Sequence, residues 1–287
     1  MSQLPIAVSP DLWVAQSDYF LTNSGIFLSE GQAVLIDPCL RVDEIDAIAE
    51  FVRAQGAVPQ WLVLTHSHWD HVLGPERFPG VRTIAQARYP EVVGRDGASI
   101  TAQVAKWELE ARQARETPFQ VPLPDETFGA EGSLSAGRLV LHLLPVPGHA
   151  ADQLAVYEPA RGCLWSSDIL SDVEIPFVSD SLAAYERTLA NLAGLDVRLL
   201  VPGHGHPTAS REAIQTRQAE DRAYLAELRE RVSRGVELGQ SAAEVVSVCV
   251  DMRYRNPDEN AGPHRLNVES AYVELGGEGE DRRLGWQ

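Results

Sequence analysis

Three histidines and one aspartate occur within six residues of this 287-residue chain, in the sequence LTHSHWDH at positions 64–71. The segment follows a short apolar run at positions 61–64, which we expect to form a buried strand. Imidazole and carboxylate groups are ligands of divalent metals such as zinc, iron and manganese. His66 and His68 can point the same way on an extended backbone, whereas Asp70 and His71 lie past the turn and face a different point. The spacing therefore indicates two metals rather than one.

Ligand-type residues recur further along the chain, each directly after a short apolar run that predicts a strand. These residues are His149, Asp168 and His204. Gly148 lets the backbone turn sharply beside His149. The alternative interpretation is a polar loop whose histidines are merely solvated, but it does not explain why four strands deliver such residues to one edge of the fold. We therefore expect a metal centre at that edge.

Asp37 ends an earlier apolar run, at positions 33–36. An aspartate at a strand end either caps a turn or orients metal ligands from behind, and both interpretations stay open here. The remaining histidines are not expected to bind metal. His142 lies in the middle of a predicted strand, His206 follows the last ligand as a surface or supporting residue, and His264 is distant in sequence.

The elements that must position these residues alternate between β and α. Glu30-Gly31 predicts a hairpin turn, and Gly56 predicts the end of a helix that completes a β-α-β unit. We expect strands at positions 6–8, 12–15, 19–22, 26–28, 33–36, 61–64, 81–85, 138–144, 153–157, 163–165 and 197–201. We expect helices at positions 43–55, 87–93, 99–116 and 181–192, and an irregular loop at 117–128.

The helix at 99–116 and the loop at 117–128 allow two interpretations. They either cover the site like a lid and supply Trp107 or Phe119 to a pocket, or these aromatic side chains pack the helix against the core. Substrate-binding residues cannot be assigned from these motifs.

Beyond position 207 the chain turns helical. Helices are predicted at 211–234, 241–252 and 266–275, with a loop at 256–263 and an acidic tail at 276–287. We divide the chain into a catalytic domain at 1–210 and an accessory helical segment at 211–287. That segment would dock on the core, complete the substrate pocket or form a homodimer contact.

The composition restricts the function classes. Acidic residues outnumber basic ones by 41 to 24, a formal net charge of −17, which disfavours nucleic-acid binding. Cys39, Cys163 and Cys249 are odd in number and far apart, which argues against disulfides or a thiolate zinc site and suits a reducing compartment. Positions 1–14 lack a signal-peptide pattern, and no apolar run is long enough to span a bilayer. We expect a cytoplasmic protein without membrane or nucleic-acid partners.

The order Asp37, His-x-His-x-Asp-His, His149, Asp168 and His204 resembles the metallo-β-lactamase superfamily over about residues 20–207. The resemblance implies an α/β fold, a four-layer αβ/βα sandwich with the metal site at one edge and here a C-terminal helical extension. It also implies ligand roles. His66, His68 and His149 would hold one metal, Asp70, His71 and His204 a second, Asp168 would bridge both, and Asp37 would sit behind them.

The motifs around His149 and Asp168 are similar to the lactonase-like and glyoxalase II-like hydrolase branches of that superfamily. The implied activity is metal-dependent hydrolysis of a small ester, lactone or thioester. A water shared by two cations about 3.5–4 Å apart has its pKa lowered towards about 7, so hydroxide is available at neutral pH. Asp70 is the implied catalytic residue, which would orient that hydroxide and move its proton. Zinc is the expected metal, with manganese, iron and cobalt as alternatives.

Several branches of the superfamily differ at named positions. Lactamases with a cysteine ligand would need Cys in place of Asp168, and flavodiiron oxidoreductases usually have Glu in place of His68. Quorum-signal lactonases carry a tyrosine where this chain has Ser171. Persulfide dioxygenases use one iron with a subset of the same ligands and form the main alternative. A phosphodiesterase or nuclease is the third hypothesis.

Overall fold

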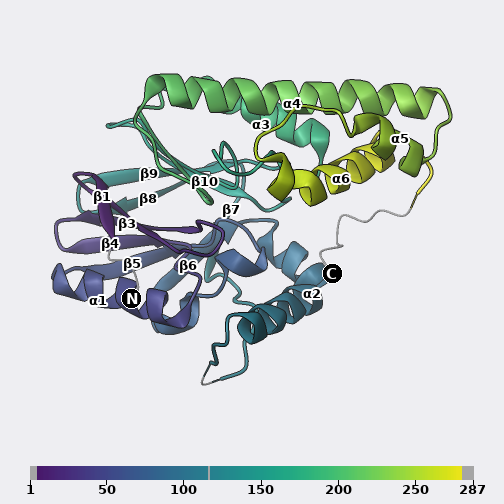
Figure 1. Ribbon diagram of the computed structural model, residues 1–287. Coiled ribbons are helices and arrows are strands. Elements are labelled where there is room, and N and C mark those ends of the chain that lie inside the picture. The colour runs from purple at the N-terminus through teal and green to yellow at the C-terminus, as the bar shows by residue number, and fades with distance from the viewer. Residues whose placement is uncertain (1–4, 116, 280–287) are drawn as a thin grey trace.

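The computed structural model describes residues 5–115 and 117–279, and its centre is a pair of β-sheets packed face to face (Figure 1). The first sheet has seven strands in chain order, β1 to β7, and the second has five in the order β12-β11-β10-β9-β8. Helices cover the outer face of each sheet. This is the predicted four-layer αβ/βα sandwich.

The first sheet is antiparallel from β1 to β4 and parallel from β4 to β7. Its strands are β1 (Ile6–Ser9), β2 (Leu12–Gln16), β3 (Asn23–Ser29), β4 (Gln32–Ile36), β5 (Val58–Val63), β6 (Arg82–Gln86) and β7 (Glu126–Phe128). Helices α1 (Val42–Ala54) and α2 (Tyr89–Glu110) pack on its outer face.

The second sheet is antiparallel except for the parallel pair β11–β12. Its strands are β8 (Gly132–Ala136), β9 (Leu139–Pro145), β10 (Leu154–Glu158), β11 (Cys163–Ser167) and β12 (Leu199–Pro202). On its outer side lie α3 (Leu182–Leu192), α4 (Arg211–Glu237), α5 (Ala242–Cys249) and α6 (Pro257–Glu274). In Figure 1 the long α4 lies across the top, with α5 and α6 beneath it.

The alternation of side chains along β4 shows why this chain forms layers. Val34 and Ile36 belong to the core between the two sheets, whereas Ala33 and Leu35 face α1 on the outer side. Successive strand residues point to opposite faces, so a strand that is apolar on both faces must be covered on both. A third core joins the outer face of the second sheet to α3–α6, with no break at residue 210. The division into two domains stays a prediction.

Several predicted elements are confirmed with small shifts. Glu30 and Gly31 both have positive φ, 50° and 74°, as the predicted two-residue hairpin requires, and Ser29 pairs with Gln32. The three cysteines are buried and unpaired. Of the helices in the described ranges, none has the length and apolar character needed to cross a bilayer.

Other expectations were wrong. Residues 19–22 do not form a strand, because Phe20 and Leu21 have φ of 55° and 48° and the backbone turns there. The helices expected at 87–93 and 99–116 are one helix, α2, whose buried face continues past two glycines and which ends at Glu110, before Arg112 adopts a φ of 51°.

The loop at 117–128 ends in β7, and β8 was not predicted. Residues 257–263, expected to be a loop, are the first turns of α6, which begins at Pro257. Proline suits the first turn of a helix because its missing N–H has no partner there. Of the expected acidic tail, residues 280–287 lie outside the described residues.

Gly25 in β3 provides a test of the packing between the sheets. A Cβ at this position would lie 2.8 Å from Cζ3 of the fully buried Trp165. We expect Gly25→Ala to lower the free energy of unfolding by about 1–3 kcal/mol in urea titrations, since the close-packed core must shift. The matched control is Gly94→Ala in α2, where nothing lies within 4 Å. That change should raise stability by about 0.5–1 kcal/mol. Equal midpoints for Gly25→Ala and the parent chain would contradict this account.

Candidate metal centre

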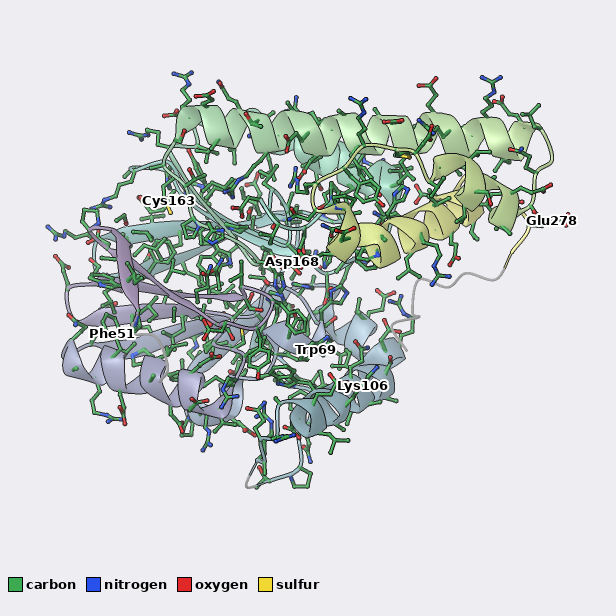
Figure 2. The ribbon with its side chains drawn as sticks, viewed as in Figure 1. Phe51, Trp69, Lys106, Cys163, Asp168 and Glu278 are labelled. Carbon is green, nitrogen blue, oxygen red and sulfur yellow. The ribbon has the colours of Figure 1, made fainter. Side chains whose placement is uncertain are left out.

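The structure brings all seven predicted ligand residues to one edge of the sandwich. The first sheet supplies His66 and His68 after β5, and Asp70 and His71 from the short 3-10 helix Trp69–His71 that follows. The second sheet supplies the other three, each just beyond a strand: His149 after β9, Asp168 after β11 and His204 after β12. Asp168 lies where the two halves of the molecule meet (Figure 2).

The ligand-type atoms form two groups. In one, single atoms of His66, His68, His149 and Asp168 all lie within 4.8 Å of one another. His149 Nε2 is 2.9 Å from His68 Nδ1 and 3.3 Å from Asp168 Oδ2. His66 Nε2 is 3.5 Å from the same Asp168 oxygen. Three imidazole nitrogens and a carboxylate oxygen thus surround one point.

The second group contains Asp70, His71 and His204. The Nε2 atoms of the two histidines are 3.2 Å apart, and Asp70 Oδ2 is 3.2 Å from that of His204. Asp168 reaches this group as well, because its Oδ1 lies 3.3 Å from His71 Nε2. The carboxylate of Asp168 therefore lies between the two groups, with an oxygen close to each.

Hydrogen bonds to the outer ring nitrogens determine which nitrogen faces the centre. His71 Nδ1 donates to Asp37 Oδ2 at 3.0 Å, and His204 Nδ1 donates to the Phe20 carbonyl at 3.1 Å. His149 Nδ1 donates to the Phe177 carbonyl at 3.1 Å. A neutral imidazole that donates from Nδ1 has its lone pair on Nε2. These three Nε2 lone pairs point into the cluster.

His66 is held in the same way through two hydroxyl groups. The Thr65 hydroxyl donates to Asp37 and lies 3.1 Å from His66 Nδ1, while Ser167 Oγ donates to the Thr65 oxygen at 3.0 Å. Asp37 also accepts the Thr65 backbone N–H at 2.8 Å. Of its two open interpretations, this geometry favours the orienting one, in which Asp37 holds the histidines from behind.

The pKa values divide the histidines of the cluster into two kinds. Burial lowers the pKa of His66 to about 4, with the neighbouring His71 acting in the same direction. Burial also lowers the pKa of His68 well below its usual value. Burial opposes the charged form of His71 and His204, but the carboxylates around them, Asp168 among them, raise their pKa well above the usual value. Burial opposes the ionised form of Asp168, but His71 and His204 hold its pKa well below the usual range. Neutral imidazoles and ionised carboxylates are the forms that bind metal ions.

Two buried polar atoms in the cluster have no hydrogen-bond partner, His66 Nε2 and Asp168 Oδ1. Such atoms are rare in folded proteins, because each loses its contacts with water without compensation. Both belong to the ligand groups, and nitrogen and carboxylate donors in this number suit a divalent cation. The residues present therefore fit a metal centre.

The remaining histidines lie outside the cluster, as expected. His142 is exposed on β9, and His206 is exposed and pairs with Asp172 at 3.0 Å. His264 is buried in α6, where Tyr224 and the Cys249 carbonyl contact its ring.

Trp107 is 4% exposed and packs beside Trp69, with 5.5 Å between ring centroids. Phe119 packs against the same core. Both aromatic side chains thus support the interpretation in which they pack against the core, rather than the one in which they belong to a lid over the site.

Sequence reasoning missed several residues around the cluster. Thr65 and Ser167 adjoin ligands in sequence, and only the hydroxyl at each position could have suggested their role. Glu174 was not predicted either, although its Oε1 lies 3.9 Å from His204 Nδ1 and its side chain is 41% exposed. Glu174 belongs to the segment after β11, and the sequence of that segment contains no motif that would have indicated this position.

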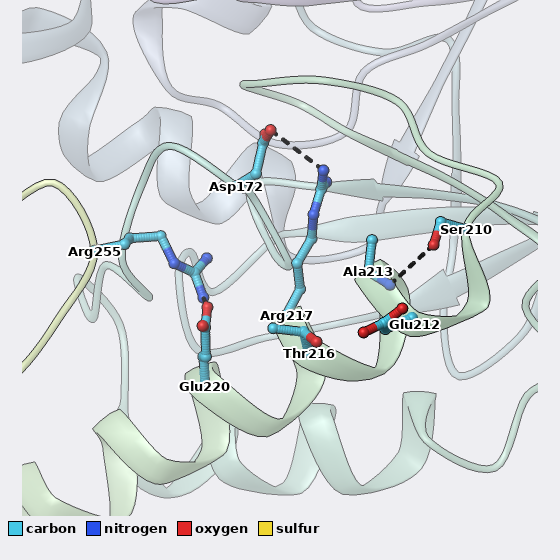
Figure 3. Close-up of a pocket in the computed structure, with 8 residues that line it drawn as sticks. All are labelled: Asp172, Ser210, Glu212, Ala213, Thr216, Arg217, Glu220 and Arg255. Carbon is cyan, nitrogen blue, oxygen red and sulfur yellow. Dashed lines mark hydrogen bonds and ion pairs between the residues drawn. The ribbon is translucent and has the colours of Figure 1, made fainter.

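A pocket of about 540 Å³ lies along the first turns of α4, beside Asp172 and Arg255 (Figure 3). None of the seven ligand residues lines it. Its two arginines are already paired, Arg217 with Asp172 at 3.3 Å and Arg255 with Glu220 at 3.1 Å. The pocket is therefore separate from the metal centre and has no uncompensated cation among its described lining residues.

Known proteins resemble this chain in sequence and in fold. A hydroxyacylglutathione hydrolase from Anaeromyxobacter dehalogenans is 28% identical over 214 residues, which cover 72% of this chain and 71% of the relative. A stereoselective inverting sec-alkylsulfatase from Pseudomonas sp. superposes with a TM-score of 0.73 at 16% identity, over 96% of this chain but 50% of the alkylsulfatase. A metallo-beta-lactamase family protein from Thermus thermophilus gives 0.66 at 21% identity, over 93% and 94% of the two chains.

The family model described as the metallo-beta-lactamase superfamily matches residues 18–204, the region that contains the whole metal centre. With its hydrolase relatives and its cluster of histidine and aspartate ligands, this protein is a metal-dependent hydrolase that belongs to the metallo-beta-lactamase superfamily.

Proposed function

We propose that this protein hydrolyses a small ester, lactone or thioester with a pair of divalent metal ions, most simply zinc. The observation that carries the proposal is the position of Asp168 between two groups of inward-facing ligand atoms. We assign His66, His68 and His149 to one metal, and Asp70, His71 and His204 to the other. Asp168 would contribute a carboxylate oxygen to each, and Asp37 would orient the histidines from behind.

A pair of divalent cations at this place would supply Lewis-acid activation of a substrate oxygen and of a water at neutral pH. The chain's own residues then position the reaction and move protons. Asp70 is 13% exposed, more than Asp168 at 5%, so its carboxylate is the more accessible of the two acids. It can accept a proton from the attacking water and pass it to the leaving group.

The aromatic side chains near the centre favour a substrate with an apolar part. Phe20 is 56% exposed and packs edge-on against Trp69, with ring centroids 6.2 Å apart. Trp69 directly precedes Asp70, and the Phe20 carbonyl holds His204, so this aromatic pair adjoins the second ligand group. The apolar part of an ester or thioester would pack there, with the carbonyl of the substrate towards the ligand cluster.

The related hydroxyacylglutathione hydrolase makes a thioester the first substrate to test. The alkylsulfatase fold match extends over α4–α6, so a sulfate ester belongs in the same screen. The net charge of −17 disfavours a polyanionic substrate such as nucleic acid. The homodimer and the cytoplasmic location stay predictions.

Metal content tests the proposal against the dioxygenase alternative. We expect elemental analysis of protein purified without added metal to find about two zinc, manganese or cobalt ions per chain. A chelator should then abolish thioester hydrolysis, and zinc should restore it. About one iron per chain, together with oxygen consumption when a persulfide is added, would contradict the hydrolase proposal and support the dioxygenase alternative.

We predict that His68→Ala removes at least one metal per chain and most of the activity while the fold persists. His68 contributes a nitrogen to the first group, and its loss leaves that metal with fewer ligands. Metal analysis, hydrolysis rates and circular dichroism check the three parts. His142→Ala, on the exposed side of β9, is the matched control and should change none of them. Normal turnover by a folded, metal-depleted variant would exclude the mechanism.

Gly203 gives a second test, because a Cβ there would collide with Asp168 Oδ1. Gly203→Ala should displace the bridging carboxylate, reduce metal content and slow hydrolysis by about 10–100-fold, as changes beside metal ligands do. Gly129→Ala, where nothing lies within 4 Å, is the control. Full metal content in Gly203→Ala would show that Asp168 does not need its observed position.

A further inference from the structure

The segment between Asp168 and α3 is held by side chains from the far end of the sequence. Its backbone groups at Ser171, Val173, Glu174, Ile175, Pro176 and Val178 all hydrogen-bond to α6 or to the residues just before it. The partners are Arg255, Asn256, Asn260 and Asn267. Asn260 and Asn267 are seven residues apart on α6, so they lie on the same side of the helix. This side of α6 therefore faces the segment that adjoins the metal centre.

Asn267 bonds to two backbone groups of this segment and is fully buried. Its Oδ1 accepts the backbone N–H of Val178 at 2.7 Å, and its Nδ2 donates to the Pro176 carbonyl at 2.7 Å. One amide thus satisfies two backbone groups on either side of Phe177. The carbonyl of Phe177 accepts the hydrogen bond from His149 Nδ1. The side chain of Asn267 therefore sets the peptide that orients a ligand residue of the metal centre.

Tyr224 and His264 determine the orientation of the Asn267 side-chain amide. His264 Nε2 is 3.0 Å from the Cys249 carbonyl, which can only accept, so in the neutral ring Nε2 carries the proton and Nδ1 accepts. The Tyr224 hydroxyl, 2.9 Å from His264 Nδ1, must then donate to it. Asn267 Nδ2 donates to the free lone pair of that hydroxyl at 2.8 Å. This excludes the flipped amide, in which Oδ1 would face the Pro176 carbonyl oxygen.

The same short segment holds His149 at a second atom. Ser179 Oγ donates to the His149 carbonyl, and His149 packs against the ring of Phe177 with centroids 5.9 Å apart. Each contact originates within two residues of Phe177. A shift of this segment would therefore move His149 at its ring and at its backbone together.

We propose that Asn267, set by Tyr224 and His264, is a positioning residue for His149, so that the C-terminal helices determine the metal affinity of the first ligand group. This inference rests on the proposed function, in which His149 is a ligand. It gives α4 and α6 a role in the chemistry although none of their residues belongs to either ligand group. It also predicts that the effect is confined to the group containing His149.

The test measures cobalt binding to the full-length protein by competition with a chromophoric chelator. We expect Asn267→Leu, which has similar volume but no polar atoms, to raise the dissociation constant of one cobalt by about 10–100-fold, the usual effect of losing an orienting contact. The visible spectrum of that cobalt should change too, because the ring of His149 is no longer fixed. Tyr224→Phe, which removes only the hydroxyl, should change both readouts in the same direction by a smaller factor.

Val268→Ala is the matched control. Val268 is the next residue of α6, is fully buried in the same core and makes no contact with the segment through polar atoms. We expect it to lower the melting temperature while cobalt affinity stays within about twofold and the spectrum is unchanged. If Asn267→Leu does not fold, Tyr224→Phe decides the question.

The outcomes separate the two proposals. If the unaltered chain binds no cobalt at all, the proposed function fails. If it binds cobalt but the Asn267 and Tyr224 variants keep both its affinity and its spectrum, only the positioning role fails. A loss of affinity in Val268→Ala equal to that in Asn267→Leu would also overturn the positioning role, because stability alone would then explain it.

Discussion

The burial of two aspartates, Asp37 and Asp168, is the constraint on which the rest of this structure depends. An ionised carboxylate away from water is tolerated only where hydrogen bonds or positive charge compensate it. Asp37 obtains this compensation from Thr65 and His71, which joins β4, β5 and the 3-10 helix. Asp168 has imidazoles at 3.3–3.5 Å but one oxygen without a partner. A bound divalent cation would complete this compensation, so that metal binding would stabilise the fold as well as supply the chemistry.

That constraint accounts for part of the strain in the backbone. Asp37 and Ser167 have φ of 42° and 53°, and Phe20 and Leu170 have 55° and 61°, a region that residues other than glycine rarely adopt. Each such residue costs about 1–3 kcal/mol and persists only where its surroundings hold it. Three of the four hold a ligand directly or through one neighbour, since Asp37 binds His71, Ser167 supports His66 through Thr65 and the Phe20 carbonyl binds His204. Part of the backbone strain therefore lies where the two sheets place these side chains at one point, whereas Glu30, Arg112 and Asn256 adopt the same region elsewhere.

The sequence predicts which histidines and aspartates meet at one edge of the fold, because each follows a short apolar strand. The different periods of apolar residues in helices and strands predict the layers. The sequence predicts poorly wherever tertiary contacts override local preference. Residues 19–22 have strand-forming side chains, yet the backbone turns so that the Phe20 carbonyl meets His204. The loop expected at 256–263 has turn-like composition, yet residues 257–263 are helical, and Asn260 in that first part of α6 donates to the Val173 carbonyl. Asn267 has no motif at all, since its role depends on a contact 91 residues away.

The two sheets support the metal centre in different ways. Most of the support for the histidines of the first sheet comes from elements of that sheet, through Asp37 and Thr65. Ser167 of β11 adds to it through Thr65. His149, from the second sheet, is held through Phe177 by a segment that α6 must brace. The second sheet alone offers no equivalent support, since the segment that contains Phe177 has no strand of its own and β12 lies at the sheet's edge. The helical extension on that side therefore supplies a support for His149 that the second sheet itself lacks.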